Sequence, residues 1–338
     1  MSDAAKPQRA ESKGDATQLA DAPTTSRYRI PTVAKLRPIK GEIAVEPDET
    51  GDWGRQTLRM RYDVLTNELP LAGGKAMRRT PSGQLLLIET LRAEAPWLER
   101  IIAIIERQLE VQLRIGQPWV QFAPLLLVGS PGCGKSWIAK RLAELCQCGH
   151  GIAELAGAMD ATIISGNPRG WNAAQPMFPA LIMSQTRTAN PICIVEEVEK
   201  SGGSMHYGDP IAALLNLLEP NNARAFYDKC LLTEVDVSHV SWILTANSIT
   251  PRLSPAFLSR VEVVEVTEPP IEAFDELLAL MLASLCRRWA LPAGMAPELP
   301  KKAIDTLRAD YRRHRSIRRL GQMLERVAGA CLPERRLN

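Results

Sequence analysis

The sequence predicts an α/β fold in which a parallel sheet carries helices on both faces and is followed by a small α-helical domain. Short apolar segments of strand length alternate with helix-like segments between residues 117 and 269, which is typical of a parallel sheet covered on both sides. After residue 270 the strand-like segments stop and amphipathic segments continue alone. The strand-like segments are residues 124–128, 192–195, 240–245 and 261–266.

The chain divides into four regions. Residues 1–54 are rich in Ala, Pro and Thr and carry charges of both signs, which predicts a disordered tail or a tether for a partner. Residues 55–116 are predicted to be a helical extension, because apolar residues recur there at helical spacing. Residues 117–269 form the large α/β domain, and residues 270–338 form the small helical domain.

Composition argues against several classes of protein. The 338 residues carry a formal net charge of +3, which does not favour a nucleic-acid binder. No apolar run is long enough to cross a bilayer, and the N-terminus lacks the apolar core of a secretory signal, so we expect no membrane partner. The seven scattered cysteines favour a reducing cytoplasm over a disulfide framework. Cys146 and Cys148 have no second ligand pair, which favours buried thiols over a metal site.

A glycine-rich segment follows the first strand and precedes a helix. It reads G-x-x-x-x-G-K-S and consists of Gly129, Ser130, Pro131, Gly132, Cys133, Gly134, Lys135 and Ser136. Phosphate oxygens need backbone N–H groups that point inward, and a side chain at Gly132 or Gly134 would obstruct that turn. The Lys135 ammonium can reach the β and γ phosphates, and the Ser136 hydroxyl can bind Mg²⁺. The pattern therefore predicts binding of ATP and Mg²⁺.

Two adjacent acids end the strand at residues 192–195. Glu196 and Glu197 would lie at the carboxyl edge of the sheet, where α/β folds bind their ligands. One carboxylate is needed near Mg²⁺, and a second is needed to orient and deprotonate an attacking water. We assign Glu196 to the metal and Glu197 to the water.

These acids are followed by Val198-Glu199-Lys200, and the whole stretch looks like the Walker B region of AAA+ ATPases. The next segment, GDPIAALLNLLEPNNARAFYDKCLLTEVDVSHVSWILTANS, resembles the ATPase module of Lon proteases. The matching residues are Gly208, Asp209, Pro210, Ala213, Leu214, Leu215, Leu218, Pro220, Phe226, Asp228, Leu231, Asp236, Ser238, Val240, Thr245, Asn247 and Ser248. The resemblance covers roughly residues 125–332. It implies an AAA+ P-loop NTPase fold with a C-terminal α-helical lid, and a homo-oligomer, in this family a hexameric ring.

The resemblance also implies roles for three residues beyond the P-loop. Asn247 corresponds to sensor 1, which contacts the γ-phosphate or the attacking water. Arg260 corresponds to the arginine finger that stabilises charge in a neighbouring subunit's site; Arg252 is a weaker candidate. Arg318 corresponds to sensor 2 on the lid and would bind the nucleotide, although Arg319 could serve instead.

A further match bears on the substrate. In Lon the loop corresponding to residues 164–181 carries an aromatic residue that faces a central pore and grips polypeptide. The resemblance places Trp171 at that position, followed by Asn172 where Lon has an aliphatic residue. A Trp side chain offers a large contact surface that tolerates many sequences. Residues 201–207 are a second candidate pore loop.

The sequence departs from the Lon pattern in two ways. Glu196 stands where the family usually has Asp, so the contact with Mg²⁺ is altered and turnover could be slower. The chain ends at Asn338, just past the lid, which leaves no room for the Lon peptidase. We therefore expect no intrinsic protease activity.

Three functions remain open. A chaperone-like ring motor that unfolds a protein substrate, brought by an adaptor or partner, ranks first because the P-loop, Glu197, Arg260 and Trp171 all support it. A nucleic-acid motor or loader ranks second, since residues 271–338 hold thirteen Lys/Arg against eight Asp/Glu. An assembly switch with little hydrolysis ranks third and is favoured only by Glu196.

Overall fold

The computed structural model describes residues 34–43, 61–170, 174–203, 208–292 and 294–332. Its centre is a five-stranded parallel sheet with the order β4-β5-β8-β3-β9. The strands are β3 (Leu125–Val128), β4 (His150–Glu154), β5 (Ile192–Glu196), β8 (Ser241–Ala246) and β9 (Glu262–Glu265). The predicted parallel sheet is therefore confirmed.

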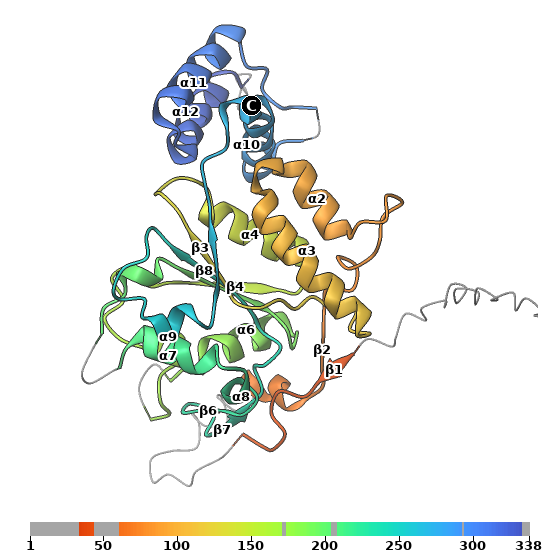
Figure 1. Ribbon diagram of the computed structural model, residues 1–338, viewed down its shortest axis with the longest axis vertical. Coiled ribbons are helices and arrows are strands. Elements are labelled where there is room, and N and C mark those ends of the chain that lie inside the picture. Colours follow the sequence, from red (N-terminus) through yellow and green to blue (C-terminus); the bar gives the residue numbers. More distant parts are fainter. Residues whose placement is uncertain (1–33, 44–60, 171–173, 204–207, 293, 333–338) are drawn as a thin grey trace, which may run out of the picture. The chain divides into compact units, whose positions relative to one another are not determined.

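Both faces of this sheet are buried under helices. Leu125 and Leu127 belong to one apolar core and Leu126 to the other, because successive side chains of a strand point to opposite faces. Figure 1 shows the two groups of helices on opposite sides of the sheet. One group is α2 (Leu86–Glu94), α3 (Glu99–Arg114) and α4 (Lys135–Cys146); the other includes α6 (Phe178–Thr186), α7 (Pro210–Leu217) and α9 (Pro255–Leu258).

Short elements connect these layers. Pro96 begins the 3₁₀ turn η2 (Pro96–Leu98), which leads directly into α3. The β6–β7 pair is an antiparallel hairpin outside the main sheet. The bounds are α5 (Thr162–Ser165), η3 (Val198–Lys200), α8 (Pro220–Ala223), β6 (Phe226–Asp228), β7 (Thr233–Val235) and η4 (Ile271–Ala273).

Three helices follow the sheet, as the sequence predicts. They are α10 (Phe274–Arg288), α11 (Lys301–His314) and α12 (Ile317–Ala330), and they enclose an apolar core of their own. The Ser316 hydroxyl accepts a hydrogen bond from the Arg319 N–H at 3.3 Å and caps α12. The buried Tyr311 hydroxyl donates to the Pro269 carbonyl at 2.7 Å, which ties α11 to the segment that leaves β9.

Part of the segment expected to be a tail packs against the domain. Strand β1 (Lys35–Leu36) pairs with β2 (Leu69–Pro70), just after the 3₁₀ turn η1 (Asp63–Thr66). Ile39 and Ile43 are buried in the core. Backbone hydrogen bonds and apolar burial hold this segment despite its proline, so the packed chain extends at least from residue 34 to residue 43.

No helix in the described part of the chain is both long and apolar enough to cross a membrane.

Candidate functional site

The glycine-rich segment after β3 forms a tight loop at the carboxyl edge of the sheet. Gly132 has φ 88° and Gly134 has φ 109°, which are left-handed conformations that favour glycine. A Cβ at Gly129 would collide with the Val266 carbonyl oxygen, so only glycine fits there. Pro131 lies in the turn, and the exposed Ser136 lies in the first turn of α4, which begins at Lys135. The loop therefore presents backbone at the positive end of a helix.

Lys135 is buried inside this loop. Its Nζ donates to the carbonyls of Gly129 at 2.7 Å and Ser130 at 3.0 Å, and to Asn247 Oδ1 at 3.1 Å. The ammonium is thus shared between the loop and the end of β8. Burial raises the pKa of the neighbouring Cys133 thiol, partly offset by the Lys135 charge, so this thiol is neutral at ordinary pH.

The carboxyl end of β5 places Glu197 in a constrained position. Its φ of 56° is unusual for a residue with a side chain, and its N–H donates to Thr245 Oγ1 at 3.1 Å. Its Oε1 lies 2.8 Å from Lys200 Nζ and 3.5 Å from Asn247 Nδ2. The hydrogen bond from Lys200 holds the pKa of Glu197 below its usual range, with help from Asn247 and from the charge of Arg318 and against partial burial. The carboxyl is therefore ionised at neutral pH.

Glu196 differs from Glu197 in its surroundings. Its Oε1 is buried and accepts no hydrogen bond within the described chain. Lys140 Nζ lies 3.7 Å from the same oxygen, which is an ion pair without a hydrogen bond. A buried carboxylate oxygen that accepts no hydrogen bond costs free energy, and a bound cation would lower that cost.

Glu199 belongs to the site although it was not among the predicted site residues. Its Oε1 accepts from both the N–H and the Nδ2 of Asn247, each at 2.9 Å, while its Oε2 is buried without a described partner. The sequence feature that could have indicated Glu199 is that it is the third acidic residue among the four residues from Glu196 to Glu199.

Of the two lid arginines, Arg318 lies beside the glycine-rich loop and Arg319 does not. The Ile317 N–H donates to the Gly132 carbonyl at 3.1 Å, and a Cβ on Gly132 would lie 3.7 Å from the Arg318 Cβ. Arg319 turns away and forms a forked pair with Asp310, at 2.7 Å through its NH2 nitrogen and 2.8 Å through its Nε. Of the two candidate arginines, Arg318 is the one beside the loop.

Arg260 lies at the opposite edge of the sheet. It precedes β9, whose first residue pairs with Leu125 at the start of β3, whereas the loop follows the end of β3. It donates to the Ala256 carbonyl at 2.8 Å and lies 3.1 Å from Glu219 Oε2. Arg252 is engaged within its own chain, at 2.7 Å from the Gly202 carbonyl and 2.5 Å from Asp209 Oδ1.

Trp171 and Asn172 lie outside the described residues. The described flanks of their loop are paired, since Asn167 and Gln175 form an antiparallel bridge. Gly166 at its base has φ 74°, and a Cβ there would collide with the Gln175 carbonyl oxygen. Of the second candidate pore loop, residues 204–207 are also outside the described chain.

The comparisons with known proteins agree with this arrangement. Residues 125–268 match the family described as "ATPase family associated with various cellular activities (AAA)". The mitochondrial Lon protease homologue of Caenorhabditis elegans is 32% identical over 199 residues, and that of Aspergillus fumigatus is 31% identical over 203 residues. The chain carries a Lon-like AAA+ ATPase module.

The match to Lon is partial in length. It covers 59% of this chain and 20% of the C. elegans protein, and 60% of this chain and 18% of the A. fumigatus protein. A closed-state cryo-EM reconstruction of Hsp104 with ATPyS and FITC casein aligns with a TM-score of 0.56 at 17% identity, over 71% of this chain and 45% of that chain. At this identity the likeness concerns the AAA+ fold alone.

The residues of the AAA+ module fit ATP and Mg²⁺. The left-handed glycines leave room for phosphate, and the Glu196 oxygen that accepts no hydrogen bond is the hard oxygen donor that Mg²⁺ prefers. An apolar crevice beside Gly134 is lined by Trp97, Trp137, Met281 and Ile317 from α2–α4 and the lid.

Proposed function

We propose that this chain is an ATP-hydrolysing AAA+ motor that works as a ring and remodels or unfolds polypeptides. The observation that carries the proposal is the hydrogen-bonded set Lys135–Asn247–Glu199, with Glu197 at its edge, at the carboxyl ends of β3, β5 and β8. A charge-neutralising ammonium, a polarised amide and an ionised carboxylate in contact are the groups that phosphoryl transfer to water needs.

Each residue has a distinct role in the proposed reaction. Glu197 orients the attacking water and takes its proton, because its carboxyl is ionised and held by Lys200. Asn247 fixes that water or the terminal phosphate, and Lys135 offsets the phosphate charge. Ser136 and Glu196 would hold Mg²⁺, which neutralises negative charge on the phosphates when bound.

Arg260 is proposed to act on a second copy of the chain. It stands at the amino edge of the sheet, away from the nucleotide loop of its own chain. A guanidinium can stabilise transferred phosphoryl charge only by contact. A head-to-tail ring supplies that contact at every interface, and a hexamer is the size that the resemblance implies.

Polypeptide is the proposed substrate class. The relatives are named Lon protease homologues, and the Hsp104 reconstruction was made with FITC casein. Trp171 would grip the polypeptide, with Asn172 beside it. The family match covers the ATPase part, so we propose ATP hydrolysis without peptide-bond cleavage for this chain, in a cytoplasmic setting that suits its buried free thiols.

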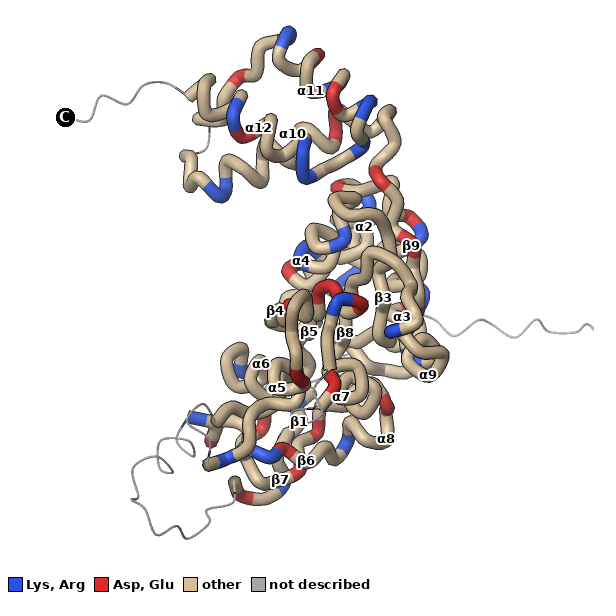
Figure 2. The backbone as a smooth tube through the Cα atoms, turned by 90° about the vertical axis from the view of Figure 1, so that its left-hand side faces the viewer, with Lys and Arg blue, Asp and Glu red and all other residues tan. Residues whose placement is uncertain are grey.

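Two alternative functions can be weighed against the proposed motor. A nucleic-acid motor would use the lid, yet acidic and basic positions are interspersed along α10, α11 and α12 (Figure 2). The second alternative, an assembly switch with little hydrolysis, is favoured if the ion pair between Lys140 and Glu196 lowers the affinity of the site for Mg²⁺.

The test is ATP hydrolysis by the purified chain alone, with an unfolded polypeptide, and with single-stranded or duplex DNA. Glu197→Gln is the blank. Stimulation by polypeptide that Trp171→Ala abolishes supports the motor. Stimulation by DNA favours the nucleic-acid alternative, and turnover no higher than the blank favours the switch.

A further inference from the structure

The turn that joins β6 to β7 is buried, although the hairpin lies outside the main sheet. We call residues 228–231 the hairpin turn. Its Asp228, Cys230 and Leu231 side chains are almost completely shielded from solvent. Turns usually lie at the surface, where water satisfies their backbone groups, so a buried turn needs hydrogen-bond partners within the protein. Several of these partners belong to the segment that contains Trp171.

The Asp228 carboxylate joins the hairpin turn to one end of that segment. Its Oδ1 accepts from the N–H groups of Cys230 and Leu231, at 2.8 Å each, and so fixes the turn itself. Its Oδ2 accepts from the N–H of Met177 at 2.7 Å. Met177 immediately precedes α6 and therefore lies where the chain returns from Trp171. All three bonds are to a charged acceptor in a buried place, where such bonds are strong.

Arg169 joins the hairpin turn to the other end of the segment. Its backbone N–H donates to the Lys229 carbonyl at 3.2 Å. Its guanidinium donates from Nε to the Cys230 carbonyl at 2.8 Å and from the NH2 nitrogen to the Leu231 carbonyl at 3.2 Å. Because the donors of a guanidinium lie in a fixed plane, these bonds set the orientation of Arg169 as well as its position.

The two ends of the segment also contact each other. The Asn167 N–H donates to the Gln175 carbonyl at 2.8 Å, and a Cβ on Gly166 would lie 2.7 Å from the Met177 nitrogen. The chain therefore leaves and returns at one place, on the hairpin turn. A side chain carried between these ends is positioned relative to that turn.

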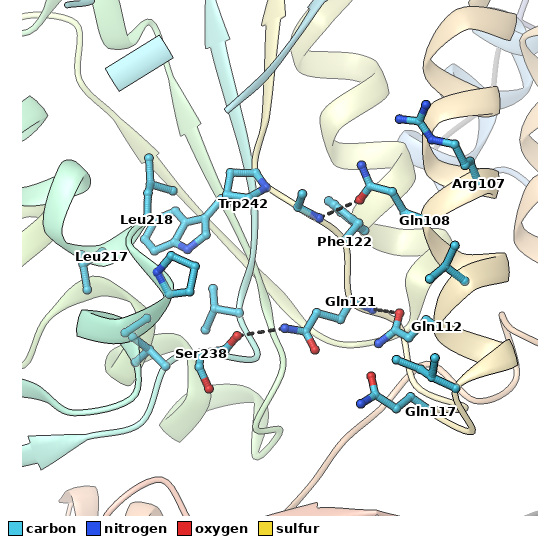
Figure 3. A pocket seen from close by; sticks show the side chains of 18 residues that line it. Arg107, Gln108, Gln112, Gln117, Gln121, Phe122, Leu217, Leu218, Ser238 and Trp242 are labelled. Atoms are coloured by element: carbon cyan, nitrogen blue, oxygen red, sulfur yellow. Dashed lines mark hydrogen bonds between the residues drawn. The ribbon is translucent and has the colours of Figure 1, made fainter. Parts of the chain in front are cut away.

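The hairpin is in turn fixed to the ATPase domain. After β7, the Asp236 N–H donates to the Pro38 carbonyl at 2.8 Å. The Ser238 carbonyl accepts from Gln121 Nε2 at 2.9 Å, a bond drawn in Figure 3 at the edge of a groove that both residues line. The chain then enters β8, whose carboxyl end leads to Asn247. The hairpin turn is thus a rigid support rather than a free surface loop.

We propose that the hairpin turn is the support that positions the polypeptide-gripping loop, with Asp228 and Arg169 as the positioning residues. The inference rests on the proposed function, because that function assigns Trp171 to the polypeptide. A loop that is held beforehand binds more tightly than one that must be ordered on binding, since ordering costs free energy. Loss of either positioning residue therefore weakens the binding of polypeptide.

The test measures polypeptide binding without ATP turnover. Arg169→Met removes the two guanidinium bonds, and Arg224→Met removes the same charge from an exposed arginine two residues before β6. Both are made in a Glu197→Gln background, and the binding of fluorescein-labelled casein is measured by anisotropy with Mg²⁺ and ATP. We expect the Kd for casein to rise about tenfold in Arg169→Met and less than twofold in the control. Equal Kd values in the two variants would overturn the inference.

A double-mutant cycle separates positioning from a direct contact with casein. If Arg169 acts through the loop, Arg169→Met should change the Kd by less than twofold once Trp171→Ala is present. A further tenfold loss in that background would contradict the positioning role.

Amide hydrogen exchange measures the support itself. Peptides that cover residues 166–177 should exchange faster in Arg169→Met than in Arg224→Met, while peptides from β3 and β5 keep the exchange of the parent and report an intact fold. Asp228→Asn is a second variant, since it keeps the side-chain shape but replaces one acceptor oxygen by an NH2 group. Unchanged exchange of residues 166–177 in both variants would show that the hairpin turn does not hold the loop.

Failure of this inference is distinguishable from failure of the proposed function. If the parent chain binds casein and Arg169→Met binds it equally well, the inference alone is wrong. If the parent chain binds no casein, the proposed polypeptide substrate and this inference are both wrong.

Discussion

Glu199 receives both the backbone N–H and the side-chain Nδ2 of Asn247 on a single carboxylate oxygen, each at 2.9 Å. With its Nδ2 bound there, the Asn247 amide is turned so that its Oδ1 accepts from Lys135 at 3.1 Å. Glu199 is therefore a positioning residue for the group proposed to hold the attacking water.

Glu199→Ala should lower kcat by about 10- to 100-fold, because a misplaced group costs that much in a preorganised site. Nucleotide affinity should stay near that of the parent, since the phosphate loop is untouched. Glu199→Gln keeps an oxygen acceptor and should retain most of the activity. Steady-state hydrolysis and nucleotide binding measure the two effects. An equal loss of kcat in both variants would contradict the positioning role.

The sequence reveals the nucleotide loop and its strands because each depends on local chemistry. The glycines before Lys135 satisfy a turn that only glycine allows, and the apolar runs of β3, β5 and β8 are buried on both faces. Strand β4 was not predicted: it lies at the edge of the sheet, where His150, Ile152 and Glu154 face solvent, so its sequence lacks a continuous apolar run.

Contacts between segments that are distant in the sequence could not be predicted, because no local sequence pattern encodes them. Ile39 and Ile43 are buried in a segment that is held by the pairing of residues 35–36 with β2, and a proline-containing segment does not predict this pairing. The position of Arg319 away from the loop depends on Asp310, which lies nine residues before it on another helix. Glu199 differs from a solvated acid through its bonds to Asn247 and through the burial of its Oε2, and both depend on distant segments.

Replacement of Lys200 should change how hydrolysis depends on pH. Its hydrogen bond to Glu197 lowers the pKa of that carboxyl, so the ionised form persists as pH falls and activity is lost only below the usual glutamate range. Lys200→Met should raise that pKa and move the acid limb of the kcat–pH profile to higher pH. Lys302→Met, an exposed lysine on α11, is the charge-matched control. An acid limb that stays in place in Lys200→Met would rule out this coupling.

Substitution of the two lid arginines should have different effects, one on nucleotide binding and the other on stability. Arg318→Ala should weaken nucleotide binding by about tenfold, equivalent to roughly 1.4 kcal/mol, because the residue lies beside Gly132. Arg319→Ala removes a solvent-exposed forked pair with Asp310 and should change the unfolding temperature little, with nucleotide binding preserved. Nucleotide titration and thermal unfolding of both variants provide the comparison. The reverse pattern would make Arg319 the nucleotide-binding residue.

Asn190 should be important for stability. It is fully buried, and its Nδ2 donates to the carbonyls of Ala72 at 3.0 Å and Val120 at 2.8 Å while its Oδ1 accepts from the Ala72 N–H. Asn190→Ala removes the partner of the Ala72 N–H and of the Val120 carbonyl, although the Ala72 carbonyl keeps its bond from the Val120 N–H, and should lower the free energy of unfolding by about 3 kcal/mol. Urea unfolding measures the loss, with exposed Asn221→Ala as the control. Equal stability of the two variants would contradict this role.

The central claim is that one site is built from two copies of the chain, with Glu197 in one and Arg260 in the other. The most direct test mixes Arg260→Ala with Glu197→Gln and measures ATP hydrolysis at fixed total protein. Each variant alone should be inactive. In the mixture, the intact Glu197 of the first variant can meet the intact Arg260 of the second, so hydrolysis should reappear. A mixture no more active than the sum of its two components would contradict the shared site.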